Sequence, residues 1–163
     1  MGHNIVGLLL PGPCDRRAVT DWDVAEVSLG GGLSLAHLTH YYTAYWQARR
    51  GATGLLDLPA GLPPVFPRER VVLHLAAALT GTAGPTFALV MTDYFGGAGD
   101  QWACVFTAGQ RAGGVRTVND ALRALGVQAT GGADEFDTVG LGRHRHTPDR
   151  LDRYEDLCTE LGV

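Results

Sequence analysis

The chain contains no lysine, because all thirteen of its basic residues are arginine. This absence excludes Schiff-base catalysis, a P-loop lysine and a lysine general base. Serine is nearly absent as well: Ser28 and Ser34 are the only two, and neither lies in a G-x-S-x-G motif. The sequence therefore gives little support to nucleophilic catalysis.

The chain also lacks a basic surplus and a long hydrophobic run. Its formal charge is −4 and its pI is near 5.8, whereas nucleic-acid-binding domains commonly have a pI above about 9. No stretch approaches the roughly 18 apolar residues that span a membrane, and the run from Ile5 to Leu10 is too short for a signal peptide. We therefore expect a soluble cytoplasmic protein with no nucleic-acid partner and no membrane partner.

Cysteine is the third scarce residue. Cys14, Cys104 and Cys158 cannot all pair, and no two of them have the spacing of a metal site. We expect free, buried thiols in a reducing compartment. A composition rich in Ala, Gly and Arg but free of Lys also indicates a bacterial source.

The length of 163 residues fits a single globular domain over residues 1–163. Apolar alternation predicts strands over 4–10, 23–29, 33–38, 86–94, 101–107 and 136–141. Helical spacing and capping residues predict helices over 39–51, 68–79, 117–126 and 147–161. Since these elements do not alternate as βαβ units, the predicted class is α+β, with a largely antiparallel sheet of five to six strands and about four helices.

The most unusual segment is rich in glycine and lies between the two strongest predicted strands. Its residues are Asp93, Tyr94, Phe95, Gly96, Gly97, Gly99, Asp100 and Gln101. A phosphate loop normally leads into a helix, but here a strand follows, so a hairpin connection is favoured. In the functional interpretation, these eight residues form a rim that binds a ligand or a partner loop.

Histidines give an alternative site. His144 and His146 would share one face of an extended segment, and His37 and His40 are spaced three apart. With Asp93, the pair His144 and His146 could bind a divalent transition metal, with His40 or Asp100 as a fourth ligand or base. The neighbouring arginines disfavour a metal ion, so surface histidines are the favoured interpretation. His3 and His74 are expected to be isolated and partly buried, without a role.

Aromatic residues recur at helical spacing at the start of the first long helix: Tyr41, Tyr42, Tyr45 and Trp46. Such a stripe usually packs into a core, and this is the favoured interpretation. An exposed stripe would instead contact a protein partner.

The segment from Thr92 to Val105 resembles one in small uncharacterised bacterial proteins, some of which are immunity proteins encoded beside toxin genes. The matching residues are Asp93 to Gly97, Gly99 to Gln101 and the apolar strand that follows, and the aromatic stretch from His40 to Gln47 fits the same pattern. The resemblance covers a small part of the chain and carries over no catalytic residue. It implies a protein that binds and blocks another protein.

The leading prediction is therefore a non-enzymatic bacterial protein-binding module, similar to an immunity protein or inhibitor, with no cofactor. The alternative is a metal-dependent hydrolase or lyase that uses His144, His146 and Asp93 with a divalent transition metal. A subunit of a homo-oligomer is a third hypothesis.

Overall fold

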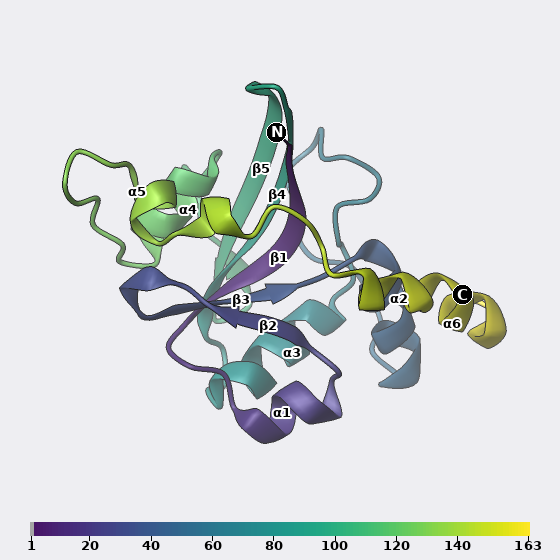
Figure 1. Ribbon diagram of the computed structural model, residues 1–163. Helices are drawn as coiled ribbons and strands as arrows, with labels where there is room; N and C mark the ends of the chain where they lie inside the picture. Colours follow the sequence, from purple (N-terminus) through teal and green to yellow (C-terminus); the bar gives the residue numbers. More distant parts are fainter. Residues whose placement is uncertain (1) are drawn as a thin grey trace.

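A computed structural model describes residues 2–163 as one six-stranded sheet with helices on both of its faces (Figure 1). The strands are β1 (His3–Pro11), β2 (Ala25–Ser28), β3 (Leu33–His37), β4 (Thr86–Phe95), β5 (Ala98–Thr107) and β6 (Gln110–Arg111). The α-helices are α1 (Arg16–Asp21), α2 (His40–Arg49), α3 (Val71–Thr80), α4 (Val118–Ala124), α5 (Glu135–Thr138) and α6 (Arg153–Leu161). Short 3-10 helices are η1 (Gly30–Gly32), η2 (Leu141–Arg143) and η3 (Asp149–Asp152).

The sheet is antiparallel throughout its named strands, in the order β2-β3-β1-β4-β5-β6. Two hairpins, β2–β3 and β4–β5, flank the central strand β1. The sheet is strongly twisted, so β2 and β3 run across the direction of β4 and β5 in Figure 1. The predicted α+β class and the largely antiparallel sheet are confirmed, with four helices of seven or more residues.

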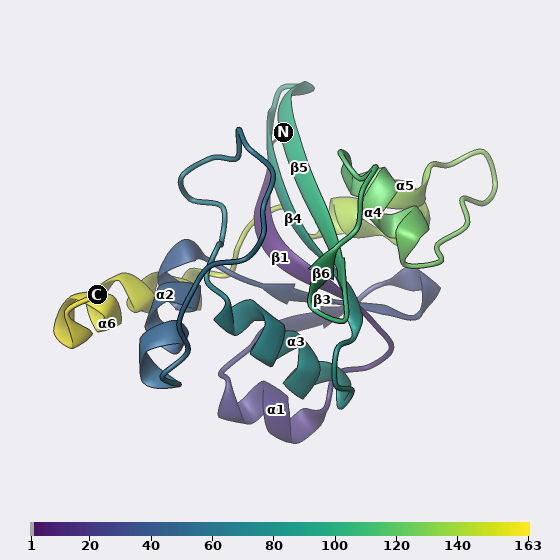
Figure 2. The same ribbon diagram turned by 180° about the vertical axis from the view of Figure 1, so that it is seen from behind.

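Both faces of the sheet are apolar, because buried side chains alternate along the central strands. In β1, Leu8 and Leu10 belong to a core that α1, α2, α3 and α6 cover. Ile5 and Leu9 point the other way, into a second core under α4 and α5. Figures 1 and 2 show these two groups of helices on opposite sides of the sheet.

The aromatic stripe of α2 belongs to the first core. Thr39 begins the helix as predicted, since its hydroxyl accepts a hydrogen bond from the Tyr42 N–H at 3.0 Å. Tyr42 is buried, and its ring lies 4.9 Å from the ring of Tyr154 in α6. Tyr41, Tyr45 and Trp46 pack against the same core as half-buried side chains, so the core interpretation is confirmed.

The predicted strand over 136–141 is wrong. Asp134 caps a helical turn there, because its side chain accepts a hydrogen bond from the Asp137 N–H at 2.8 Å. The chain continues as α5, turns at Gly140 with a φ of +75°, and then forms η2. The capping box of Thr117 and Asp120, by contrast, begins α4 as predicted.

Other expectations have mixed outcomes. Helix α1 and strand β6 were not predicted. The three cysteines are free and buried, as expected. His3 is half-buried, but His74 is exposed and not partly buried.

Over residues 2–163, no helix is both long enough and apolar enough to cross a membrane.

The C-terminal helix is attached through Asp23, which lies between α1 and β2. The Asp23 carboxylate accepts hydrogen bonds from Arg150 at 2.9 Å, from Arg153, and from the Tyr154 hydroxyl at 2.6 Å. These contacts join segments about 130 residues apart in the sequence and attach η3 and the start of α6 to the segment between α1 and β2.

The segment after η2 extends the sheet at the free edge of β1. Strand β3 pairs with β1 only from Gly7 onward, which leaves the first residues of β1 without that neighbour. The Asn4 N–H donates to the Arg145 carbonyl at 2.8 Å, and Asn4 forms a parallel bridge with His146. This contact brings the C-terminal histidines beside the N-terminal strand.

Candidate functional site: the β4–β5 hairpin and the pocket at its base

The glycine-rich segment is a tight hairpin that projects beyond the helices (Figure 1). Strands β4 and β5 stay in register up to the pair Phe95 and Ala98, so the turn consists of Gly96 and Gly97 alone. Their φ values are +61° and +81°, as in the turns that suit the twist of a hairpin. The predicted hairpin connection is confirmed.

Gly99 is required for a different reason. A Cβ atom at this position would lie 2.0 Å from the Asp93 carbonyl oxygen and 2.7 Å from the Tyr94 Cα. No real Cβ contact is that short, so only glycine lets the two strands meet here. Because Gly96, Gly97 and Gly99 carry no side chains, the tip exposes only the side chains of its few other residues.

The outer face of the tip carries one large apolar side chain and two carboxylates. Phe95 is 81% exposed, and side chains two residues apart share a face, so Asp93 lies on the same face as Phe95. Asp100 is directly opposite Asp93 in the register, and both are exposed. Neither forms a salt bridge with any residue from 2 to 163. Like charges directly opposite each other destabilise a strand pair. The stability of the described fold therefore does not explain why two carboxylates lie here.

The inner face of the same hairpin lines a pocket of about 400 Å³. Tyr94 and Gln101 point into it, together with His3 and Thr92 from the adjacent part of the sheet. Helix α4, helix α5 and the segment after η2 form the opposite wall, with Asn119, Asp134, Phe136 and Arg145. The eight predicted binding residues thus divide into an exposed tip and two pocket residues, Tyr94 and Gln101.

Gln101 joins the hairpin to α4. Its Nε2 donates to the Tyr94 hydroxyl at 2.7 Å, and its Oε1 accepts from the Val118 N–H at 2.7 Å. Both ends of the amide are therefore engaged. The Tyr94 hydroxyl accepts this bond and keeps its own proton to donate within the pocket.

His3 forms the floor of the pocket as a neutral ring. Its Nε2 lies 3.1 Å from the Leu141 carbonyl, which only accepts, so Nε2 carries the proton and donates. Its Nδ1 then accepts from the Thr92 hydroxyl at 2.7 Å. Burial, and secondarily the charge of Arg145, lower the pKa of His3. The ring also lies edge-on to Phe136, with centroids 5.2 Å apart.

The opposite wall is polar and rigid. Asn119 donates to Asp134 at 3.1 Å and accepts from the Phe136 N–H at 2.9 Å, which ties α4 to α5. The hydrogen bond from the Asp137 N–H lowers the pKa of Asp134. Arg145 lines the same pocket and forms no salt bridge within residues 2–163. The pocket therefore contains several groups that can donate hydrogen bonds to a ligand or accept them from it.

Two residues of the metal hypothesis, Asp93 and His146, lie beside β1. Asp93 and His146 are the neighbours of Asn4 on its two sides, so β1 separates them. Within residues 2–163, no three His, Cys, Asp or Glu side chains form a group that could hold a metal ion. No observation favours the fourth ligand proposed from His40 or Asp100, and the metal hypothesis stays a prediction.

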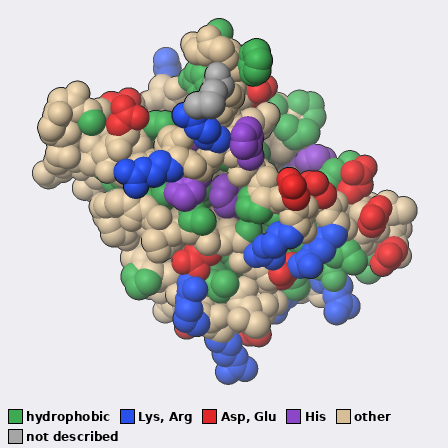
Figure 3. Space-filling model, viewed as in Figure 1, with side chains coloured by type: hydrophobic (Ala, Val, Ile, Leu, Met, Phe, Trp, Pro, Cys, Tyr) green, Lys and Arg blue, Asp and Glu red, His purple; other side chains and the backbone are tan. Residues whose placement is uncertain are grey.

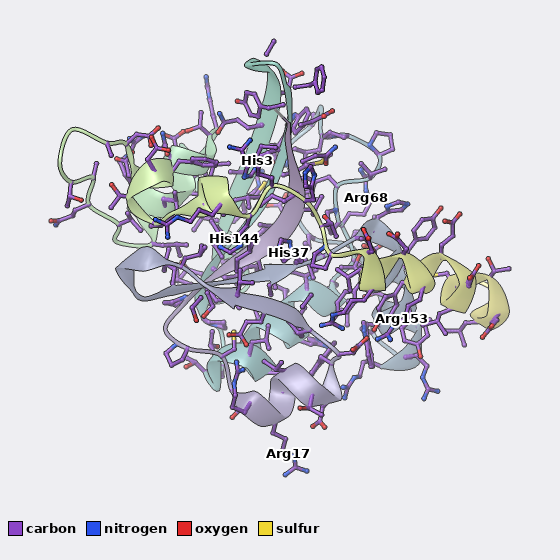
Figure 4. All side chains as sticks on the ribbon, viewed as in Figure 1. His3, Arg17, His37, Arg68, His144 and Arg153 are labelled. Carbon is purple, nitrogen blue, oxygen red and sulfur yellow. The ribbon has the colours of Figure 1, made fainter. Side chains whose placement is uncertain are left out.

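One histidine from each predicted pair, His37 and His144, lies close to the other. Figure 4 shows His3, His144 and His37 close to one another along β1, and Figure 3 shows histidine side chains gathered on this face. Their charges act on one another, because protonation of His144 or His3 disfavours protonation of His37. His3 was assigned no role from the sequence, and no motif marks it.

No protein-family model, curated protein or solved structure matches this chain.

Proposed function

We propose that this chain is a non-enzymatic protein-binding module that contacts its partner through the tip of the β4–β5 hairpin. The observation that carries the proposal is Phe95, which is 81% exposed at the end of a projecting hairpin. An aromatic side chain in water adds nothing to the stability of the fold. Full burial of the same side chain in a pocket of a partner would contribute about 1.5–3 kcal/mol.

The carboxylates beside Phe95 define the chemistry of the partner. Asp93 and Asp100 repel each other in the free chain, and a basic surface would relieve that repulsion on contact. The expected partner surface is an apolar pocket with arginine or lysine at its rim. The net charge of −4 would steer the chain toward such a surface.

A bacterial toxin is the partner class that we favour. The resemblance of residues 92–105 to immunity proteins supports it, because those proteins bind and block a toxin encoded nearby. The proposed action is steric: the rigid hairpin fills a pocket on the toxin and needs no chemistry of its own.

The proposal is tested by photo-crosslinking in the cells that produce the chain. A photoreactive phenylalanine at position 95 should crosslink a partner, whereas the same residue at position 161 should not. Leu161 is a matched control because it is 42% exposed and lies in α6, far from the hairpin in Figure 1.

Affinity measurements with the captured partner complete the test. Phe95→Ala should weaken binding by about tenfold or more, and Leu161→Ala by less than about twofold. Both variants should retain the stability of the parent chain, since both side chains are exposed. The proposal is wrong if position 95 yields no crosslink, or if the two alanine variants bind equally well.

A further inference from the structure

The pocket at the base of the hairpin contains a row of side chains from three neighbouring segments of the chain. His3 of β1 pairs with Tyr94 of β4 in the antiparallel register. On the other side of β1, Asn4 donates to the Arg145 carbonyl and forms a parallel bridge with His146, so Arg145 lies beside His3. Paired residues point to the same face of a sheet, and the side chains of His3, Tyr94 and Arg145 all line the pocket. The neutral His3 ring therefore has a guanidinium on one side and a phenol hydroxyl on the other.

This row favours an anionic group. Arg145 is half-buried and forms no salt bridge with any residue from 2 to 163. Its charge acts within the pocket, because it helps to lower the pKa of His3. A guanidinium offers its N–H donors in a fork that matches a carboxylate. The Tyr94 hydroxyl accepts a hydrogen bond from Gln101 at 2.7 Å, so its own proton is available to a second anionic oxygen.

The part of the pocket formed by α5 and its cap carries the opposite charge. Asp134 and Asp137 line the same pocket, and both are exposed. The Asp134 carboxylate is engaged, since it accepts from the Asp137 N–H at 2.8 Å and from Asn119 at 3.1 Å. The Asp137 carboxylate forms no salt bridge with any residue from 2 to 163. One pocket thus contains a cation and two carboxylates that do not pair with each other.

A ligand with a single charge fits this arrangement poorly. The two aspartates disfavour a simple anion, and Arg145 disfavours a simple cation or a metal ion, because like charges brought together are costly. A molecule that carries both charges is attracted by both groups. The pocket also offers apolar surface, from Val118 and from the Phe136 ring, whose centroid lies 5.2 Å from that of His3.

We infer that this pocket binds a small zwitterion of the kind represented by a free amino acid with an apolar side chain. Arg145 and the Tyr94 hydroxyl would bind the carboxylate, and Asp137 would bind the ammonium group. Phe136 and Val118 would contact the side chain of the ligand.

The size of the pocket agrees with such a ligand. Its volume of about 400 Å³ lies within the range of about 300–1,000 Å³ that is typical of small-molecule sites. The inference goes beyond the proposed protein partner and does not rest on it. The partner would contact Phe95 at the exposed tip, whereas the pocket uses the inner face of the hairpin.

The test is an NMR titration of the full chain with phenylalanine and with leucine. Each amino acid is compared with an analogue that lacks the ammonium group and with one that lacks the carboxylate. For phenylalanine, these analogues are 3-phenylpropanoate and 2-phenylethylamine. Saturable changes in the backbone amide signals of Phe136 and Gly142 report on the pocket, whereas the signals of α6 should stay unchanged.

We expect at least one of the two amino acids to bind about tenfold or more tightly than both of its analogues, since each analogue lacks one charge-assisted hydrogen bond. No saturable change with either amino acid overturns the inference. Analogues that bind as tightly as their amino acids overturn it as well, because the pocket then does not select both charges.

Two variants test the two charges separately. Arg145→Gln should weaken binding of the amino acid by about tenfold or more, and it should not weaken binding of the amine analogue, which has no carboxylate. Asp137→Asn should weaken binding of the amino acid and should not weaken binding of the carboxylate analogue. The control is Arg143→Gln, which removes the same charge from an exposed position that does not line the pocket.

Arg143→Gln should change the affinity by less than about twofold, because an exposed charge outside the site makes only a screened contribution. All three variants should retain the urea-unfolding stability of the parent chain, since none of the three side chains forms a salt bridge within residues 2–163. Equal losses of affinity in Arg145→Gln and Arg143→Gln would show unspecific charge attraction and overturn the inference.

Discussion

At the scale of single residues, His37 makes the fold sensitive to acid. Its pKa is about 4 in the folded chain, against 6.5 for an unperturbed histidine. Between these values the unfolded chain binds a proton that the folded chain excludes. The contribution of the neutral ring is therefore complete above pH 6.5 and is lost as the pH falls toward 4. This shift corresponds to about 3 kcal/mol of unfolding free energy.

Replacement of His37 by asparagine should remove most of this pH dependence, because asparagine does not titrate. We expect the variant to lose about 3 kcal/mol less than the parent chain between pH 7 and about pH 4. Urea unfolding at the two pH values measures the difference. His74→Asn, on the exposed face of α3, should behave as the parent does. Equal pH dependence in the parent and in His37→Asn would contradict the assignment.

At the scale of elements, the hairpin tip depends on the close approach of its strands at Gly99. Gly99→Ala would place a Cβ 2.0 Å from the Asp93 carbonyl, so β4 and β5 must separate locally. We expect a loss of about 1–3 kcal/mol, together with faster amide hydrogen exchange over residues 93–100. Gly113→Ala is the control, because a Cβ there meets nothing within 4 Å. If the two variants have the same stability and exchange, the tip does not need glycine at position 99.

Local signals in the sequence were sufficient to predict most of the helices and strands. Thr39 and the Thr117–Asp120 pair mark the starts of helices α2 and α4 through side-chain hydrogen bonds that span three residues. Alternation in β4 and β5 is likewise visible in the sequence. The segment 136–141 was misread because a short apolar run does not separate strand from helix. The N-terminal cap at Asp134 favours a helix in this segment.

The pocket at the base of the hairpin was not predictable in the same way. The hydrogen bond between His3 and Leu141 joins residues 138 positions apart, and Gln101 meets the N-terminus of α4 across 17 positions. No sequence period encodes such contacts. The tip residues could be predicted because their glycines are a local signal, whereas the role of Arg145 in the pocket depends on the pairing of the segment after η2 with β1.

At the scale of the whole molecule, two surfaces with different chemistry lie on one sheet. The hairpin tip exposes Phe95 and two aspartates, whereas the face with the histidines carries arginine and acidic side chains next to one another (Figure 3). The chain as a whole has a net charge of −4. The aspartates of the tip form no salt bridge within residues 2–163, so they would attract a basic partner.

The two aspartates of the tip allow stability and binding to be separated. Asp93→Asn together with Asp100→Asn removes a like-charge pair that no residue from 2 to 163 neutralises, so the free chain should become more stable by about 0.2–1 kcal/mol. The same variant should bind the partner captured through position 95 more slowly at low salt. The control, Asp156→Asn with Glu160→Gln, removes the same charge from exposed positions on α6. Urea unfolding and association kinetics measure both effects.

A gain in stability with a loss of binding, confined to the hairpin variant, is expected only of carboxylates placed for a partner. Equal loss of binding in the control would mean that net charge alone steers the chain and that the tip makes no specific contact.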